Sequence, residues 1–196
     1  MQSFWRIAPA LLAFAFSAPA QAKIVSSTDV SYFTVDGSTP AEIYHNILDR
    51  GPRVSGERAL ASISTLATQD GGLTEANGTC KVTDYVINLD FKIQRPRIAN
   101  EQVLPDNERA MWQELNGFIA THEDQHKAVW LGCARELEQK IDALRAPSCG
   151  EVITAGEALW QEMLSACDKT QRSFDAEQSR TLMKQPFMLR ALKVAK

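Results

Sequence analysis

Alternating apolar and polar positions mark the first half of the chain. The alternation is clearest in KVTDYVINLDFKI (residues 81–93), where every second side chain is apolar: Tyr85, Ile87, Leu89, Phe91 and Ile93. The side chains between them are mostly polar. A period of two with a single apolar face is typical of a strand that is buried on one side only.

Capping and turn residues divide the segment before this strand. A first strand is predicted over residues 26–35, where Asp36 and Gly37 end it. Ser38 is the predicted N-cap of a short helix that runs to about Asp49, with a proline in its first turn.

The segment between that helix and the clear strand is harder to assign. Residues 58–68 (RALASISTLAT) fit a strand or a helix, whereas residues 69–79 (QDGGLTEANGT) are rich in turn-forming residues and are predicted as a loop. We therefore predict a small antiparallel sheet within residues 23–98.

The second half has the period of a helix. A long helix is predicted from Asp106 or Asn107, either of which can cap it, to about Arg145. One face of it can be followed in steps of three or four residues through Leu115, Ile119, His122, His126, Val129, Cys133, Leu137, Ile141 and Leu144.

A second helix is predicted over residues 153–180, and it would return beside the first as an antiparallel hairpin. The amphipathic tail around Pro186 is predicted as a packed or frayed terminal helix. The chain is therefore expected to be an α+β protein with one domain over residues 23–196, in which a sheet-rich half (23–98) precedes a helical half (99–196).

The long helix carries an H-E-x-x-H motif at His122, Glu123 and His126. Residues i and i+4 project from the same face of a helix, so both imidazoles can reach one zinc ion. Glu123 can serve as the general base that activates a zinc-bound water. The alternative is a pair of core histidines, which would need several hydrogen-bond partners. The remaining histidine, His45, is expected at the surface or at an interface.

The four cysteines are Cys80, Cys133, Cys149 and Cys167. A zinc site of four cysteines needs closely spaced pairs, which are lacking, so an even number in an exported protein favours two disulfides. Three connectivities are possible. Cys133 and Cys167 lie at similar distances from the turn of the hairpin, which favours Cys133–Cys167 and leaves Cys80–Cys149.

A catalytic zinc ion usually has three protein ligands and a water molecule. The run KAVWLGCARELE after His126 does not continue as the metzincin pattern HExxHxxGxxH, so the third ligand must come from elsewhere. The second helix is the best source, and a Cys133–Cys167 bridge would place Asp175 or Glu177 opposite the two histidines. Other acidic residues of this helix are Glu157, Glu162 and Asp168.

The first residues have the features of a secretory signal peptide. A short apolar run follows Arg6, and Ala20-Gln21-Ala22 is a small-x-small signal that predicts cleavage after Ala22. We expect the protein to be periplasmic or secreted, without stable membrane insertion. Removal of residues 1–22 leaves a net charge of about −4 (20 basic minus 24 acidic residues), which gives no support for nucleic-acid binding.

Several segments together resemble DUF922, a bacterial family of predicted secreted zinc-dependent proteases. They are the strand TCKVTDYVINLDFKI, the helix MWQELNGFIATHEDQH, the loop APSCG and the late run SFDAEQSRT. The resemblance implies a protease-like site. The family pattern Y-D-x-x-T-x-H-G has a histidine where this chain has Arg180, which cannot ligate a metal.

The sequence thus predicts an exported zincin-like zinc metallopeptidase that acts on a peptide or protein substrate. An exposed strand edge could hold an extended peptide, and Tyr85 and Arg180 are candidates to stabilise the oxyanion. The alternatives are a non-catalytic metal- or partner-binding envelope protein with a degenerate site, and a purely structural protein held by disulfides.

Overall fold

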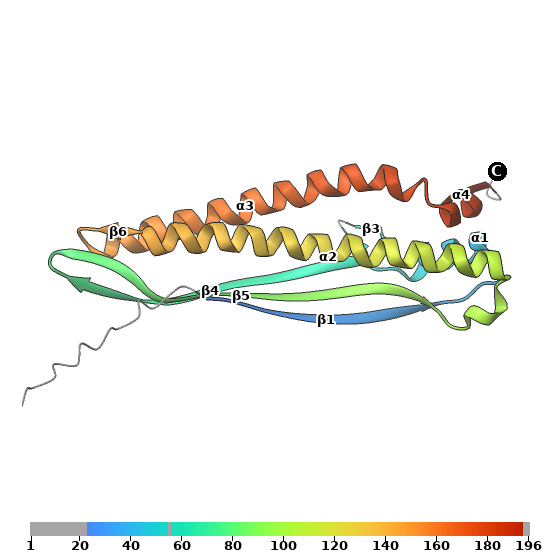
Figure 1. Cartoon of the computed structure of the whole chain (residues 1–196), viewed down its shortest axis with the longest axis horizontal. Coiled ribbons are helices and arrows are strands. Elements are labelled where there is room, and N and C mark those ends of the chain that lie inside the picture. The colour runs from blue at the N-terminus through green and yellow to red at the C-terminus, as the bar shows by residue number, and fades with distance from the viewer. Residues whose placement is uncertain (1–22, 55, 194–196) are drawn as a thin grey trace, which may run out of the picture.

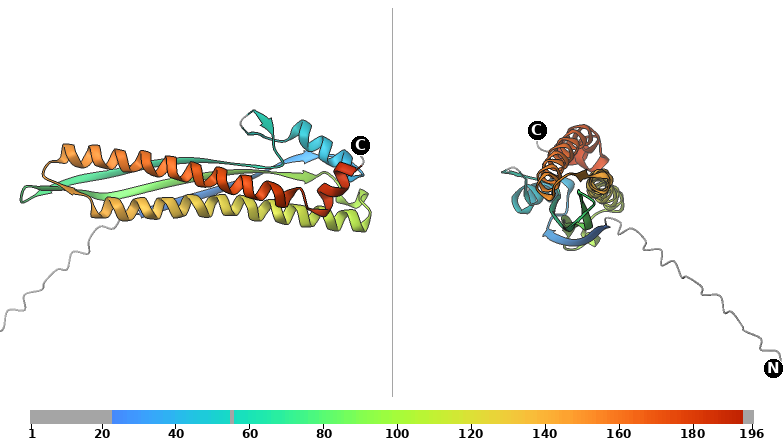
Figure 2. Two further views of the ribbon diagram at one scale, coloured as in Figure 1. Left: turned by 90° about the horizontal axis from the view of Figure 1, so that it is seen from above. Right: turned by 90° about the vertical axis from the view of Figure 1, so that its left-hand side faces the viewer.

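The computed structural model describes residues 23–54 and 56–193. The molecule is elongated, and two long helices lie side by side along a narrow sheet (Figures 1 and 2). The sheet contains β1 (Lys23–Val35), β4 (Ser62–Ala76) and β5 (Thr79–Ile98), and the long helices are α2 (Asp106–Ala143) and α3 (Cys149–Leu182). This arrangement confirms the predicted α+β class.

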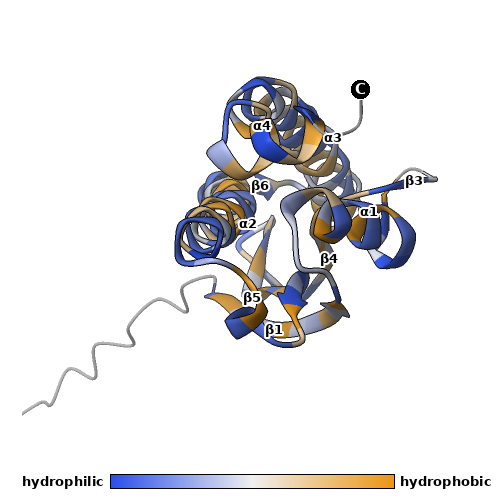
Figure 3. Cartoon of the chain, turned by 90° about the vertical axis from the view of Figure 1, so that its right-hand side faces the viewer, coloured by the Kyte–Doolittle hydropathy of each residue, from blue (hydrophilic) through white to orange (hydrophobic). Residues whose placement is uncertain are grey.

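Short elements complete the fold. At one end of the molecule, α1 (Pro40–Arg50) and α4 (Pro186–Lys193) pack against each other, as seen end-on in Figure 3. Two-residue strands β2 (Arg53–Val54) and β3 (Glu57–Arg58) form a separate hairpin. A 3-10 turn η1 (Glu101–Val103) precedes α2, and β6 (Arg145–Ala146) joins the far end of β5.

The sheet is not entirely antiparallel, which corrects the sequence-based expectation. The strand order is β1-β5-β4, and β5 pairs antiparallel with β4 and β6 but parallel with β1. The chain reverses direction between β1 and β4, and it reverses again at the turn before β5. The strand β5 therefore has the direction of β1, and its central place makes their pairing parallel.

Residues 69–79 do not form the predicted loop. They continue β4 to Ala76, and the hairpin turns at Asn77 and Gly78, which both have positive φ (54° and 71°). An Asn-Gly pair suits a two-residue hairpin turn because both positions need a left-handed backbone. The register shifts between Asp70 and Gly72, where a glycine allows the strand to pass close to the Tyr85 ring.

Three helix starts differ from those predicted. The N-cap of α1 is Thr39, whose side chain accepts from the Glu42 N–H. Neither Asp106 nor Asn107 caps α2, because both lie inside a helix that begins directly after Pro105 without a side-chain cap. The helix α3 begins four residues earlier than expected, because Ser148 and Glu151 form a capping box.

The hydrophobic core is divided into two clusters along α2. The first joins Trp112, Leu115 and Ile119 to the apolar faces of α1 and α4. The second joins Ala134, Leu137 and Ile141 to β5 and α3. The stretch from His122 to Trp130 lies between these two sets of α2 residues, so the H-E-x-x-H motif occupies the junction between the two cores.

Two disulfides connect the parts of the fold, and they have the pairing favoured from the sequence. Cys80–Cys149 ties the start of β5 to the start of α3, and Cys133–Cys167 ties α2 to α3. The predicted signal peptide, residues 1–22, lies outside the described residues. Within residues 23–54 and 56–193, no helix has the length and apolar character needed to cross a bilayer.

Phe187 offers a test of how strongly α4 is anchored to the first core. Its ring is fully buried and lies 5.3 Å from that of Trp112, centroid to centroid. Phe187→Ala is expected to lower the free energy of unfolding by about 3–5 kcal/mol, measured by urea denaturation. The control is Leu189→Ala on the exposed side of α4, for which we expect a loss below about 1 kcal/mol. Equal losses would contradict this packing.

Candidate metal centre

The two histidines of the motif meet an acidic residue from α3. Nε2 of His122 lies 3.0 Å from Nε2 of His126, and Oδ1 of Asp175 lies 3.3 Å and 2.9 Å from these two atoms. The spacing of His122 and His126 places both rings on the side of α2 that faces α3. Three possible ligand atoms from two helices therefore converge on one point.

The triangle formed by these atoms matches the size of a metal site. A tetrahedral zinc ion with bonds of about 2.0–2.1 Å keeps its ligand atoms about 3.3–3.4 Å apart. The side chains of His122, His126 and Asp175 would have to separate by less than about 0.5 Å to reach that geometry. Two imidazoles and a carboxylate are also a donor set that zinc binds readily.

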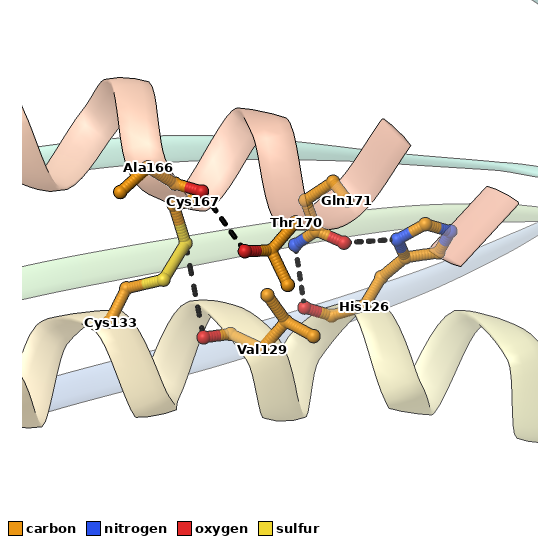
Figure 4. Close-up of a disulfide and its surroundings, with 7 residues drawn as sticks. All are labelled: His126, Val129, Cys133, Ala166, Cys167, Thr170 and Gln171. Atoms are coloured by element: carbon orange, nitrogen blue, oxygen red, sulfur yellow. Dashed lines mark hydrogen bonds between the residues drawn. A yellow bond between two sulfur atoms is a disulfide. The ribbon is translucent and has the colours of Figure 1, made fainter. Parts of the chain in front are cut away.

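Gln171 makes two hydrogen bonds to His126, one to its ring and one to its backbone (Figure 4). Nε2 of Gln171 donates to the backbone carbonyl of His126 at 2.9 Å, and Oε1 of Gln171 accepts from Nδ1 of the ring. A carbonyl can only accept, so the amide has only one possible orientation and Nδ1 must carry the proton. With Nδ1 as the donor, Nε2 of the neutral imidazole carries the lone pair that a metal ion requires.

Aromatic rings enclose the His122 side. Its ring stacks on Phe174 at 4.9 Å between centroids and on Phe118 at 6.4 Å, while Phe174 meets the edge of His126. Burial, together with the nearby His126, lowers the pKa of His122. The lower pKa favours the neutral imidazole, which is the form that can ligate a metal.

Glu123 is buried beside the histidines, with 4% of its surface exposed. Burial raises the pKa of its carboxyl group to about 7, and the charges of His126 and Arg95 offset part of this effect. Within the part of the chain that the structure describes, Oε2 of Glu123 and Nδ1 of His122 are buried without a hydrogen-bond partner. Unpaired buried polar atoms are rare in folded proteins, and their presence here indicates a place for a ligand or water.

These side chains line a cavity of about 580 Å³, a size common for ligand pockets. His122, Glu123 and His126 of α2 line it together with Gln171 and Asp175 of α3. Further lining residues come from α1, from the β2–β3 hairpin, from the beginning of β4 and from Met188 of α4.

The other sequence candidates do not join this cluster. Glu177 is exposed. Among the described residues, the possible metal ligands that lie close together are His122, His126 and Asp175, and Glu177 is not one of them. A step of two residues from Asp175 leads to the opposite side of the helix, which explains why Glu177 points away. Asp168 lines the cavity but pairs with Arg172. Tyr85 donates to Gln69, and neither it nor Arg180 lines the cavity.

Gln171 was not a candidate in the sequence analysis. Its spacing could have identified it: Gln171 lies four residues before Asp175 and four after Cys167, so all three residues share one face of α3. The Cys133–Cys167 bridge lies two turns beyond His126 and holds that face against α2 (Figure 4). The disulfide therefore sets the register in which Gln171 and Asp175 meet the histidines.

Comparison with known proteins gives one match. Residues 30–181 match the model of a family described as "Bacterial protein of unknown function (DUF922)". No curated protein and no solved structure matches the chain significantly.

The hydrogen bonds of Gln171 predict an effect on metal affinity. We expect Gln171→Ala to weaken binding of Zn²⁺ or Co²⁺ by about 10- to 100-fold, because the His126 ring loses its orienting partner. Competition with a chelating dye measures this affinity. Gln178→Ala is the matched control, since Gln178 lies on α3 and lines the same cavity but makes no hydrogen bond to either histidine. An equal effect in both variants would exclude the orienting role.

The two disulfides allow a second matched comparison. Removing either bridge by a pair of Cys→Ser substitutions should lower the free energy of unfolding by roughly 4 kcal/mol, because the unfolded chain gains entropy when the loop is opened. The two losses should be similar, since this entropy depends only on the logarithm of the loop length, and the cysteines are 34 and 69 residues apart. Only loss of Cys133–Cys167 should also weaken metal binding in protein that is still folded, as checked by circular dichroism. Unchanged affinity in that variant would show that helix packing alone sets the register.

Proposed function

The chain belongs to the DUF922 family, and we propose that it is an exported zinc-dependent metallopeptidase that hydrolyses peptide bonds. The observation that carries this proposal is the convergence of His122, His126 and Asp175 at 2.9–3.3 Å beside a buried, unpaired Glu123, all facing one cavity. Structural zinc sites are closed by four protein ligands, whereas three ligands beside an open cavity are typical of catalytic sites.

His122, His126 and Asp175 would hold the zinc ion. When bound there, zinc would lower the pKa of a water ligand and polarise the carbonyl of the scissile bond. Gln171 keeps Nε2 of His126 directed at the ion, and Phe118 and Phe174 shield the His122 ring from bulk water.

Glu123 is the proposed general base. Its Oε2 atom makes no hydrogen bond to the described residues, so it is available to take a proton from the attacking water and later to pass it to the leaving amine. A pKa of about 7 suits this exchange, because such a carboxyl group can both accept and release a proton near neutral pH.

The substrate would bind as an extended peptide along β4. Ser62, Ile63 and Thr65 at the start of β4 line the cavity, and β4 pairs only with β5 in the described sheet. Its other edge can therefore form main-chain hydrogen bonds with an added strand. The two disulfides are compatible with an exported protein.

A second candidate is a metal- or partner-binding envelope protein without catalytic activity. Arg180 stands where the family pattern has a histidine, and Asp175 is a half-exposed ligand. A half-exposed carboxylate attracts an ion more weakly than a buried one, because water screens its charge, and this favours a reversible binding role over a permanent catalytic ion.

Two substitutions separate these roles. Purified wild-type protein is expected to bind one equivalent of Zn²⁺ and to cleave peptides, and His122→Ala should lose both properties. Glu123→Gln should keep the zinc but lower kcat by at least about 10²-fold, because only the proton acceptor is removed. Zinc content is measured by mass spectrometry and cleavage with a mixed peptide library. Bound zinc without any cleavage by the wild type would support the binding protein instead.

A further inference from the structure

The cavity is lined by apolar as well as polar side chains. Beside the residues of the candidate metal centre, it is lined by an apolar wall whose residues come from segments far apart in the sequence: Tyr44 and Leu48 of α1, Val54 of β2, Leu60, Met183 and Met188. Tyr44, Leu60 and Met188 also pack in the first hydrophobic cluster, which accounts for their positions. Neither that cluster nor the proposed reaction accounts for Leu48, Val54 and Met183.

Part of this apolar wall is open to solvent. Leu48, Val54 and Met183 keep 38%, 48% and 46% of their surface exposed. Exposed apolar side chains that gather around one cavity mark a binding surface, because removing each of them from water when a ligand binds is favourable. These three residues come from α1, β2 and the end of α3, so only the folded chain brings them together.

The edge of β4 determines what can reach this wall. Ile63 and Thr65 pair with Ile93 and Phe91 of β5, so their side chains share the face of the sheet that is covered by the helices. A peptide added to β4 would likewise alternate, and every second side chain would enter the cavity. Such a side chain would then reach the apolar residues that line the same cavity.

We propose that this wall is a specificity pocket for a large apolar side chain of an extended peptide, such as leucine, methionine or phenylalanine. The inference rests on the proposed peptidase function and adds the class of substrate. Acidic side chains are disfavoured there, because Leu48, Val54 and Met183 offer no charge to pair with a buried carboxylate, and Arg58, the one lysine or arginine among the described lining residues, already donates to the backbone carbonyl of Gly51.

A pair of peptides that differ only at the pocket position tests the proposal. With a leucine and an alanine at that position, the wild type is expected to show a ratio of kcat/KM of about tenfold or more in favour of leucine. Leu48→Gln and Met183→Gln should reduce this ratio at least threefold, because each removes apolar surface from the pocket. Both residues are partly exposed, so the folded state should be retained, as checked by thermal melting.

Leu66→Gln is the matched control. Leu66 is an exposed apolar residue of β4 that does not line the cavity, so its substitution should leave the ratio unchanged. A wild type that cleaves leucine, alanine and glutamate peptides equally, or ratios that do not respond to Leu48→Gln and Met183→Gln, would overturn the pocket while leaving the peptidase intact.

A binding experiment separates this inference from the peptidase proposal. If the wild type cleaves no peptide, fluorescence anisotropy with labelled leucine and glutamate peptides reports on the pocket directly. Binding of the leucine peptide that weakens in Leu48→Gln and Met183→Gln would support an apolar peptide site in a non-catalytic protein. Absence of binding to either peptide would overturn the pocket together with the peptidase.

Discussion

The contact between α2 and α3 is fixed at three successive points: the Cys133–Cys167 bridge, the pair of hydrogen bonds between Gln171 and His126, and the approach of Asp175 to both histidines. Each point lies about one helical turn from the next along α3. A shift of α3 by one residue would turn Gln171 and Asp175 away from α2. The candidate metal centre therefore depends on this register more than on any single ligand.

The position of the site between two hydrophobic clusters explains how the fold tolerates it. Glu123 and His126 are the buried polar residues of the described chain, with 4% and 6% of their surface exposed. Burying such groups is unfavourable unless they are paired, and the apolar clusters on either side stabilise α2 independently of this stretch. A metal ion would offset this unfavourable burial by pairing with the histidines and Asp175, whereas the unpaired oxygen of Glu123 would remain available to exchange a proton.

Membership of DUF922 places the chain in a family without an established function, so the physical properties of the site carry the functional argument. The same cavity contains a candidate metal centre, a buried carboxyl group with a raised pKa, an open strand edge and an apolar wall. Each of these features is found in proteins that only bind ligands. A peptidase would use all four together, since it must hold the ion, move a proton and position an extended substrate.

Local patterns in the sequence determined much of this protein. The period of two in β5, the helical step that aligned His122 with His126, and the similar distances of Cys133 and Cys167 from the hairpin turn can all be read from spacing along the chain. The tertiary structure alone decided the parallel pairing of β1, the inclusion of Asp175 rather than Glu177, and the clamp by Gln171. It also assembled the apolar wall from α1, β2 and the end of α3, because these contacts depend on how distant segments pack and not on spacing within one segment.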